Sequence, residues 1–326
     1  MKVLVTGAAG FIGFHLCKAL IEQGHKVVGI DNMNDYYDPK LKHDRLHILE
    51  NMSIDSFYFE NFTLGEGGSN LKMVMDWFHP EIVVNLAAQA GVRYSLANPQ
   101  AYIDANVSGF LEVLEACVSK RPRLLLYASS SSVYGDGETP SSEYSQTSRP
   151  LSMYAATKKM NELMAHSYSS LYGIDTVGLR FFTVYGEYGR PDMALFKFVQ
   201  NILSNQPLDL YNHGNHERSF TYVGDVVESM IALMNATAYE AALVTDIVNI
   251  GGDKAETLNR YVEVIEQELG MKAEINYMDM QAGDVHRTEA DCFHLQDLIG
   301  YQPRTSIEEG IKRFVYWFRK YYGESL

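Results

Sequence analysis

A tyrosine and a lysine, Tyr154 and Lys158, stand four residues apart in a segment predicted to be helical, Ser152 to Tyr172. Residues at positions i and i+4 share one face of a helix, so the phenol and the ammonium group are expected to lie side by side. A neighbouring positive charge favours phenolate and lowers the pKa of a phenol. A phenol tuned in this way can act as a general base near neutral pH. In isolation such a pair is more often a surface contact, so its meaning depends on the elements around it.

Four serines, Ser129 to Ser132, directly follow a segment with the composition of a buried strand, Arg123 to Ala128. Hydroxyl groups at the carboxyl end of a strand can hydrogen-bond an oxygen atom of a substrate. The alternative is a turn in which the serines bond their own backbone, and we expect this of at least one of the four.

The first 31 residues carry a pattern typical of a nucleotide-binding unit. An apolar run, Val3 to Val5, leads into a glycine-rich turn, and Phe11 to Glu22 then carries apolar residues at helical spacing. A second apolar run, Val27 to Ile30, ends at Asp31. A strand, a tight turn, a helix, a second strand and a terminal acid predict a βαβ unit that binds a dinucleotide.

The three glycines of this turn have distinct physical tasks. Gly7 allows a turn that a Cβ would block, Gly10 lets the backbone approach a pyrophosphate, and Gly13 lets the helix pack closely on the sheet. The N-terminus of the helix offers free N–H groups to the phosphates. Asp31 is expected to accept hydrogen bonds from the adenosine ribose and to repel a 2′-phosphate, which favours NAD over NADP.

The chain has 326 residues and a formal net charge of −14. Nucleic-acid binding requires a basic surface, so a nucleic-acid partner is not expected. If the ligands carry phosphate groups, local cations must overcome the acidic surroundings, and the candidates are Lys158, Arg93, Arg190 and Arg218. Each arginine has an ordinary alternative, a surface ion pair with one of the many acids.

No apolar run approaches the roughly 20 residues that a membrane-spanning helix needs, so no membrane association is expected. The cysteines, Cys17, Cys117 and Cys292, are odd in number and lack metal-binding spacing. We expect reduced core thiols in a cytoplasmic protein, and no metal site.

Strands alternate with helices from residue 1 to about residue 180, which predicts an α/β fold with a Rossmann-type doubly wound parallel sheet. We expect residues 1–180 to form the cofactor domain and residues 181–326 a smaller mixed α/β domain for the substrate. The boundary is not clean, because the elements near 225–250 could return to pack on the first domain. Further strands are predicted at 56–62, 82–87, 176–182, 208–211, 246–250 and 274–278, and helices from about 39 and at 71–78, 99–118, 193–205, 225–235, 257–269 and 307–322.

Several motifs together resemble the extended short-chain dehydrogenases/reductases. They are the glycine turn at 7–13, the acid at 31, Asn-Leu-Ala-Ala at 85–88, Ser-Ser-Ser-Ser-Val-Tyr-Gly at 129–135 and Tyr-Ala-Ala-Thr-Lys at 154–158. Within that group, the segments 31–38, 87–99, 154–168, 179–198 and 211–214 closely resemble the UDP-glucuronate 4-epimerases and their relatives in capsule-sugar synthesis. The resemblance covers nearly the whole chain, and segment 181–198 is its most specific part.

The resemblance implies a mechanism of C4 epimerisation. Tyr154 would remove the proton of the C4 hydroxyl, Lys158 would tune Tyr154 and hold the nicotinamide ribose, and Ser130 would be the hydroxyl partner at O4. NAD would take the C4 hydride and stay bound, the 4-keto sugar would turn about its diphosphate link, and the hydride would return to the other face. UDP-glucuronate would thus become UDP-galacturonate, for polysaccharide biosynthesis, with no net redox change.

The resemblance also assigns binding residues. The implied cofactor site consists of Gly7, Gly10, Phe11, Ile12, Gly13, Asp31, Asn32, Asn61, Leu86, Ala87, Ala88, Tyr154 and Lys158. The implied substrate site consists of Arg93, Ser130, Ser131, Ser132, Thr183, Arg190, Arg218 and Asp284. In the family, positions such as Thr183, Ser131 and Ser132 contact the sugar carboxylate. The three arginines take positions that meet anionic groups, and Asp284 lies near the uridine ribose.

Two residues depart from the family pattern. Asn61 stands where the family usually has an Asp near adenine, which puts the affinity for NAD in question. Ser219 replaces the acid of the usual Arg-Asp-Phe sequence.

Other activities on the same scaffold remain open. Nucleotide-sugar 4,6-dehydratases need an Asp-Glu pair after the hydroxyl residue, and decarboxylases carry a Glu in that loop, where this chain has Ser131 and Ser132. Serine hydroxyls do not exchange protons near pH 7 as carboxylates do, which favours epimerisation. Epimerisation of UDP-glucose or a UDP-N-acetylhexosamine is a further alternative, against which Arg190 and Thr183 argue. A catalytically silent NAD sensor would not need Tyr154 and Lys158 at helical spacing.

The helices predicted at 99–118 and 152–172 have apolar faces that could pack against a second copy of the chain. The resemblance implies such a homodimer with a four-helix interface. The alternative is that both faces are buried against the chain's own sheet.

Overall fold

The computed structural model describes residues 1–236, 245–281 and 284–323. Its largest feature is a seven-stranded sheet in the order β10-β6-β5-β4-β1-β2-β3, in which every neighbouring pair is parallel. The strands are β1 (Lys2–Thr6), β2 (Lys26–Asp31), β3 (Phe57–Asn61), β4 (Ile82–Asn85), β5 (Leu124–Ala128), β6 (Thr176–Phe181) and β10 (Thr245–Ile250). The predicted doubly wound α/β fold is confirmed.

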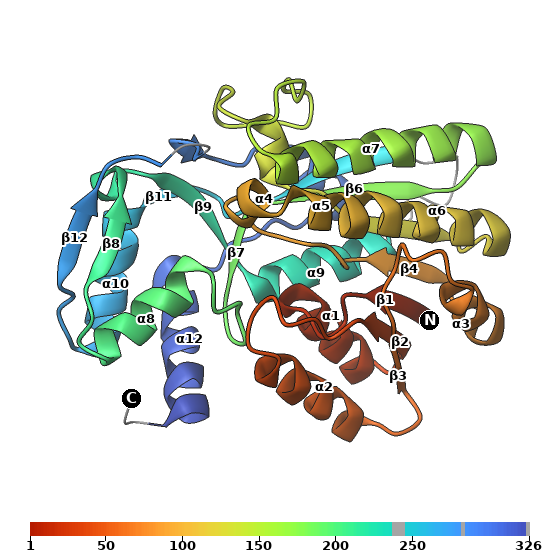
Figure 1. Cartoon of the computed structure of the whole chain (residues 1–326), viewed down its shortest axis with the longest axis horizontal. Coiled ribbons are helices and arrows are strands. Elements are labelled where there is room, and N and C mark those ends of the chain that lie inside the picture. The colour runs from red at the N-terminus through yellow and green to blue at the C-terminus, as the bar shows by residue number, and fades with distance from the viewer. Residues whose placement is uncertain (237–244, 282–283, 324–326) are drawn as a thin grey trace.

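Helices cover both faces of this sheet, because its central strands are apolar on both sides. In β1, Val3 and Val5 point into one core and Leu4 into the other. The first core lies under α1 (Phe11–Glu22), α2 (Lys40–Met52) and α9 (Val223–Met234). The second lies under α3 (Asn70–Phe78), α6 (Gly109–Lys120) and α7 (Met153–Tyr172), on the other side of the sheet in Figure 1.

The smaller part of the molecule gathers beyond the carboxyl ends of the large sheet, on the left in Figure 1. One small sheet contains β7 (Thr183–Tyr185), β9 (Glu217–Tyr222), β11 (Ala255–Thr257) and β13 (Arg287–Thr288), and a second pairs β8 (Leu208–Tyr211) with β12 (Ile275–Met278). The helices of this smaller part are α8 (Ala194–Leu203), α10 (Leu258–Leu269) and α12 (Ile307–Tyr322), whereas α11 (Phe293–Ile299) packs against β10 and α9. Among the described residues, none of the helices combines the length and apolar character needed to cross a bilayer.

The chain returns to the large sheet after leaving it. Strand β10 pairs with β6 in register from Thr245 opposite Thr176 to Ile250 opposite Phe181. Helix α9 packs against α1. Residues beyond 180 therefore complete the sheet, while the division into domains 1–180 and 181–326 stays a prediction.

The helix predicted over 99–118 is interrupted, and this detail of the prediction was wrong. After α4 (Tyr94–Ala97) and α5 (Pro99–Tyr102), the chain forms a π-helical turn, Ile103–Ser108, before α6 begins. The wider turn places the buried Asn106 side chain against the segment after β4, where it accepts from the Gln89 N–H at 2.8 Å and donates to the Gln89 carbonyl at 3.0 Å. It also donates to Thr157 on α7. The Asn106 side chain thus links the segment after β4 to α7. π-helical turns frequently occur at functional sites.

Strand β9 was not among the predicted strands, because segment 212–220 is polar and rich in turn residues, which indicates a loop. Only the short 3-10 turn Asn212–Gly214 matches that prediction. The strand lies between β11 and β13, also pairs with β7, and its residues from Ser219 on are all buried. A strand buried on both faces lacks the alternation of apolar and polar residues that would have indicated it.

Candidate active site

A cavity of about 1090 Å³ lies at the carboxyl ends of the large sheet and extends to the smaller part of the molecule. Its lining contains the predicted cofactor residues Gly7, Gly10, Phe11, Ile12, Gly13, Asp31, Asn32, Leu86, Ala87 and Ala88. It also contains Ser130, Ser131, Ser132, Tyr154 and Lys158, and then Arg93, Thr183, Arg190, Arg218 and Asp284. The structure therefore brings together all but one of the residues selected from the sequence.

Asn61 is the exception. It ends β3 opposite Asp31, but it is exposed and does not line the cavity. The residues that follow it, Phe62 and Thr63, do line the cavity. The position of Asn61 therefore does not support its inclusion in the cofactor site, because the lining of the cavity begins at the next residue, Phe62.

The glycine turn is packed so closely that its three glycines leave no room for a side chain. The N–H groups of Gly7 and Ala8 both donate to the Ile30 carbonyl, and Gly7 has a φ of +71°. A Cβ on Gly13 would lie 2.1 Å from the Gly7 carbonyl oxygen, and one on Gly10 would lie 2.9 Å from the same atom. The backbone is therefore bare at the N-terminus of α1, which fits the close approach of a dinucleotide phosphate.

Asp31 lies beside a lysine that the sequence analysis did not select. Its carboxylate accepts from the N–H groups of Ala9 and Met33, and the Nζ atom of Lys42 lies 3.7 Å from Oδ1. Lys42 is also buried, and burial lowers the pKa of its ammonium group whereas Asp31 raises it. The Lys42 charge opposes the repulsion that Asp31 was expected to exert on a 2′-phosphate.

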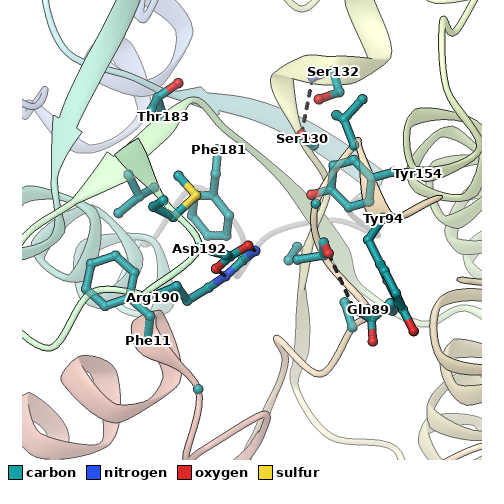
Figure 2. Close-up of a pocket in the computed structure, with 18 of the residues that line it drawn as sticks. Phe11, Gln89, Tyr94, Ser130, Ser132, Tyr154, Phe181, Thr183, Arg190 and Asp192 are labelled. Atoms are coloured by element: carbon teal, nitrogen blue, oxygen red, sulfur yellow. Dashed lines mark hydrogen bonds and ion pairs between the residues drawn. The ribbon is translucent and has the colours of Figure 1, made fainter. Parts of the chain in front are cut away.

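Tyr154 and Lys158 both face the cavity from α7, which begins with Ser152 as its N-cap. Ser130 and Tyr154 both line the cavity, and the nearby Ser130 hydroxyl opposes the rise of the Tyr154 pKa. Figure 2 shows these two side chains on the same side of the cavity. The Ser132 N–H donates to Ser130 Oγ at 3.2 Å and orients that hydroxyl. Ser132 belongs to the 3-10 turn Ser131–Tyr134, so part of the serine segment does bond its own backbone, as expected.

The predicted lowering of the Tyr154 pKa by Lys158 was wrong for this arrangement. Burial raises the pKa of Tyr154 and outweighs the opposing effects of the nearby Ser130 hydroxyl and of the Arg190 charge. The Lys158 ammonium group is directed to the Ala128 carbonyl, to which it donates at 2.9 Å. Arg190, on the opposite side of the cavity, is therefore the cation that favours the phenolate form of Tyr154.

Lys158 should make the stability of the protein rise with pH. Burial lowers its pKa from the usual 10.5 to about 8. Between these two values the unfolded chain binds more protons than the folded one, so the free energy of unfolding rises with pH, by up to about 3 kcal/mol. Urea unfolding of the wild type and Lys158→Met at about pH 7.5 and about pH 10 measures this. The advantage of Lys158→Met should shrink at the higher pH, and a constant difference would contradict the prediction.

A buried ion pair between Glu162 and Arg180 holds the first residue of the serine segment, Ser129. The Ser129 hydroxyl donates to Glu162 at 2.7 Å, and Arg180 Nε and Nη2 donate to the two oxygens of the same carboxylate at 2.8 and 2.9 Å. Burial alone raises the pKa of Glu162, but the hydrogen bonds and charge of Arg180 outweigh it and hold the pKa low. Arg180 also donates to Tyr134, whose hydroxyl donates to Asn249 on β10.

The sequence contained two unused signals for this pair. Glu162 follows Lys158 by four residues and thus lies on the same helix face. Arg180 is the one charged residue of an otherwise apolar strand, and a buried charge requires a partner.

Glu162→Leu should lower the free energy of unfolding by about 3–5 kcal/mol, because it leaves the Arg180 guanidinium buried without a counter-charge. The double variant Glu162→Leu/Arg180→Met should recover most of this loss, since no buried charge remains. Urea unfolding of both variants and of the wild type makes the comparison. If the double variant is no more stable than Glu162→Leu, the loss does not come from the unpaired charge.

The predicted substrate arginines differ in their surroundings. Arg93 lies over the Tyr211 ring and its Nη2 is 3.5 Å from Asp284 Oδ2, so two predicted substrate residues are paired with each other. Arg218 donates from Nη1 to the carbonyls of Glu217 and His286, and burial lowers its pKa. Among the residues that the structure describes, no carboxylate lies within ion-pair distance of Arg218, which leaves its charge available to an anion.

Arg190 has a partner that the sequence analysis missed, because it forms a bidentate pair with Asp192. Figure 2 shows this pair on the side of the cavity opposite Tyr154, near Phe11, with Thr183 and Ser132 across from each other at the top of the view. Ser219, the second departure from the family pattern, is fully buried and its hydroxyl accepts from the Ala290 N–H. Within the described residues, no group of three or more His, Cys, Asp or Glu side chains is placed to hold a metal ion.

Known proteins similar to this chain belong to a family of NAD-dependent enzymes, in agreement with the fold and the glycine turn. Residues 3–251 match the model of the NAD dependent epimerase/dehydratase family, and the chain belongs to this family. It is 48% identical to protein CapI of Staphylococcus aureus, over 99% of both chains. It is 46% identical to a probable UDP-glucuronate 4-epimerase of Rhizobium meliloti (strain 1021), over 99% of this chain and 98% of that one.

A solved structure is similar over its whole length. The crystal structure of UDP-glucuronic acid 4-epimerase from Bacillus cereus, in complex with UDP-glucuronic acid and NAD, superposes with a TM-score of 0.91 at 32% identity. The match covers 98% of this chain and 99% of that chain. The resemblance noted in the sequence is thereby confirmed.

Proposed function

We propose that this protein is an NAD-dependent UDP-sugar 4-epimerase that interconverts UDP-glucuronate and UDP-galacturonate. The observation that carries the proposal is the Tyr154 phenol, which lines one cavity together with Ser130, the glycine turn and the substrate arginines. Relatives named as UDP-glucuronate 4-epimerases, at 40–46% identity and matching almost the whole of this chain, support the choice of substrate.

The residues present fit NAD. Gly7, Gly10 and Gly13 line the cavity with bare backbone, which the phosphates could approach, and the Asp31 carboxylate ends the neighbouring strand, where it would accept from the adenosine ribose. Phe11, Ile12, Asn32 and the segment Leu86–Ala88 complete the proposed cofactor wall. Bound NAD supplies the acceptor, and then the donor, of the C4 hydride.

The chain's own residues would move the proton and hold the sugar. Tyr154 takes the proton of the C4 hydroxyl, and Ser130, fixed by the Ser132 N–H, holds the same oxygen through its hydroxyl. Lys158 holds the nicotinamide ribose. The sugar keeps its carboxylate, because Ser131 and Ser132 provide hydroxyl groups where a decarboxylase carries a carboxylate.

The sugar-nucleotide side of the cavity provides the anion contacts. Arg218 and Arg93 bind the diphosphate, and Asp284 lies beside them for the uridine ribose. Thr183, Ser131 and Ser132 hydrogen-bond the sugar carboxylate, and Arg190 contributes a further donor to the substrate's anionic groups. Arg218 is the strongest of these assignments, because it is a largely buried cation that a ligand anion would neutralise.

The decisive experiment incubates the purified protein with UDP-glucuronate and follows the sugar protons by NMR. The C4 epimer should accumulate to equilibrium without release of CO₂ and without net NADH absorbance. Parallel tubes with UDP-glucose and UDP-N-acetylglucosamine test the neutral-sugar alternatives. Release of CO₂ would indicate a decarboxylase, and no conversion of any UDP-sugar would contradict the proposal.

We further propose a cytoplasmic homodimer. Cys17, Cys117 and Cys292 are free and buried, in keeping with a reducing compartment. Helices α6 and α7 pack on the sheet with one face and expose Leu111, Leu163 and Leu171 on the other, which favours a shared interface formed by both helices. Sedimentation of the wild type should give a dimer and Leu163→Glu a monomer, whereas a monomeric wild type would refute the interface.

A further inference from the structure

Asp192 links two segments that are far apart in the sequence. Arg190 donates from Nε and Nη2 to the two oxygens of this carboxylate at 2.9 and 2.5 Å, and the Tyr36 hydroxyl donates to Oδ2 at 3.2 Å. The Arg190 guanidinium also lies over the Tyr36 ring, with Cζ 5.8 Å from the ring centroid. Figure 2 shows the Arg190 and Asp192 side chains against each other inside the cavity.

The two segments come from different parts of the fold. Tyr36 lies in segment 32–39, which leaves β2 directly after Asp31 on the cofactor side. Arg190 and Asp192 lie in segment 186–193, which connects β7 to α8. All three side chains line the same cavity as Asp31. The Tyr36–Asp192 hydrogen bond therefore joins the segment after β2 to the connection between β7 and α8 within the lining of the cavity.

The start of segment 186–193 is fixed by buried hydrogen bonds to other parts of the chain. The fully buried Arg45 donates to the carbonyls of Ala9 and Tyr188 at 2.8 and 2.6 Å. The His15 ring contacts the Glu187 carbonyl at 2.8 Å, and burial lowers the pKa of His15 to about 4, so the ring stays neutral at ordinary pH. These contacts fix residues 187 and 188 to the glycine turn and to α1.

The Tyr36–Asp192 hydrogen bond differs from the Arg45 and His15 contacts because it is partly exposed to solvent. The side chains of Arg190 and Asp192 are 19% and 29% exposed, whereas Arg45 is fully buried. Burial raises the pKa of Asp192, but Arg190 outweighs this effect and keeps the carboxylate charged. Burial and the Asp192 charge raise the pKa of Tyr36, so its hydroxyl keeps the proton that it donates. The bond persists across neutral pH and can still open.

We propose that Tyr36 and Asp192 form a latch that retains the bound dinucleotide, with Arg190 holding the Asp192 carboxylate in place. The inference rests on the proposed function, because a 4-epimerase must keep the same cofactor between the two hydride transfers. Segment 32–39 continues directly from Asp31, the proposed partner of the adenosine ribose. A dinucleotide that leaves the cleft must displace this segment, and the latch opposes that displacement.

The test measures release of NAD in the absence of any sugar. Protein loaded with NAD is freed of excess cofactor by gel filtration, and the NAD that remains bound is quantified over time. Tyr36→Phe and Asp192→Asn should each release NAD about tenfold faster, the effect of losing one hydrogen bond to a charged group. Tyr94→Phe is the matched control: its ring packs 5.1 Å from that of Tyr36, but its hydroxyl accepts from Asn98.

The double variant separates a latch from two independent effects. If Tyr36 and Asp192 act as one unit, Tyr36→Phe/Asp192→Asn should release NAD no faster than the faster single variant. Unchanged release in both single variants, additive effects in the double variant, or equal acceleration in Tyr94→Phe would overturn the latch. A wild type that binds no NAD at all would instead refute the proposed function.

Discussion

Tyr154→Phe should lower kcat for C4 epimerisation by about a thousandfold, because it removes the only group proposed to take the C4 hydroxyl proton. The ring remains, so the phenylalanine keeps the edge-to-face contact with Tyr102 at 6.1 Å between centroids. Binding of NAD and of the UDP-sugar should therefore change little. Initial rates from the NMR assay give kcat, and calorimetric titration gives both affinities.

A second substitution of the same type controls for the loss of a hydroxyl elsewhere. Tyr58 lies on β3, at the edge of the large sheet, and is exposed outside the cavity. Tyr58→Phe should retain the wild-type kcat. If Tyr154→Phe also retained it, the general base would have to be another group, and the assignment of Tyr154 would fail.

Gly13→Ala should abolish NAD binding and lower the free energy of unfolding by about 3 kcal/mol or more. The new Cβ would lie 2.1 Å from the Gly7 carbonyl oxygen, 2.8 Å from its carbonyl carbon and 3.1 Å from the Ala8 Cα. All three are backbone atoms, so no side chain can rotate away, and the turn itself must move. Urea unfolding and calorimetric titration with NAD measure the two effects.

Gly68→Ala provides the comparison, because a Cβ at Gly68 would have its nearest neighbours at 3.9 Å and Gly68 does not line the cavity. This variant should unfold within about 0.5 kcal/mol of the wild type and bind NAD normally. A Gly13→Ala protein that behaves in the same way would show that the turn has room that the structure does not indicate.

Local patterns predicted the regular elements well, because each depends on a short stretch of chain. Helix α1 begins at Phe11 and ends at Glu22, as predicted from apolar spacing and the glycines on either side. The π-turn at 103–108 and strand β9 were not predicted, since both arise from distant partners. Asn106 bonds to the segment after β4, and β9 is surrounded by strands from three other parts of the chain.

The membership of the cavity could be predicted, whereas its electrostatics could not. Tyr154, Lys158 and Ser130 were selected from spacing and resemblance, and the structure places all three in the lining of one cavity. The ammonium group of Lys158 nevertheless turns to a carbonyl, and the cation that acts on Tyr154 comes from Arg190. Direction and burial of a side chain depend on packing, which residue spacing does not encode.

The position of β10 has a consequence for any attempt to divide this protein. A fragment ending near residue 180 would lack the seventh strand and α9, and would leave β6 with a row of unsatisfied N–H and C=O groups beside apolar side chains. An exposed edge strand of this kind can pair with the edge strand of another molecule, which leads to aggregation. The amino-terminal portion is therefore expected to aggregate when expressed by itself.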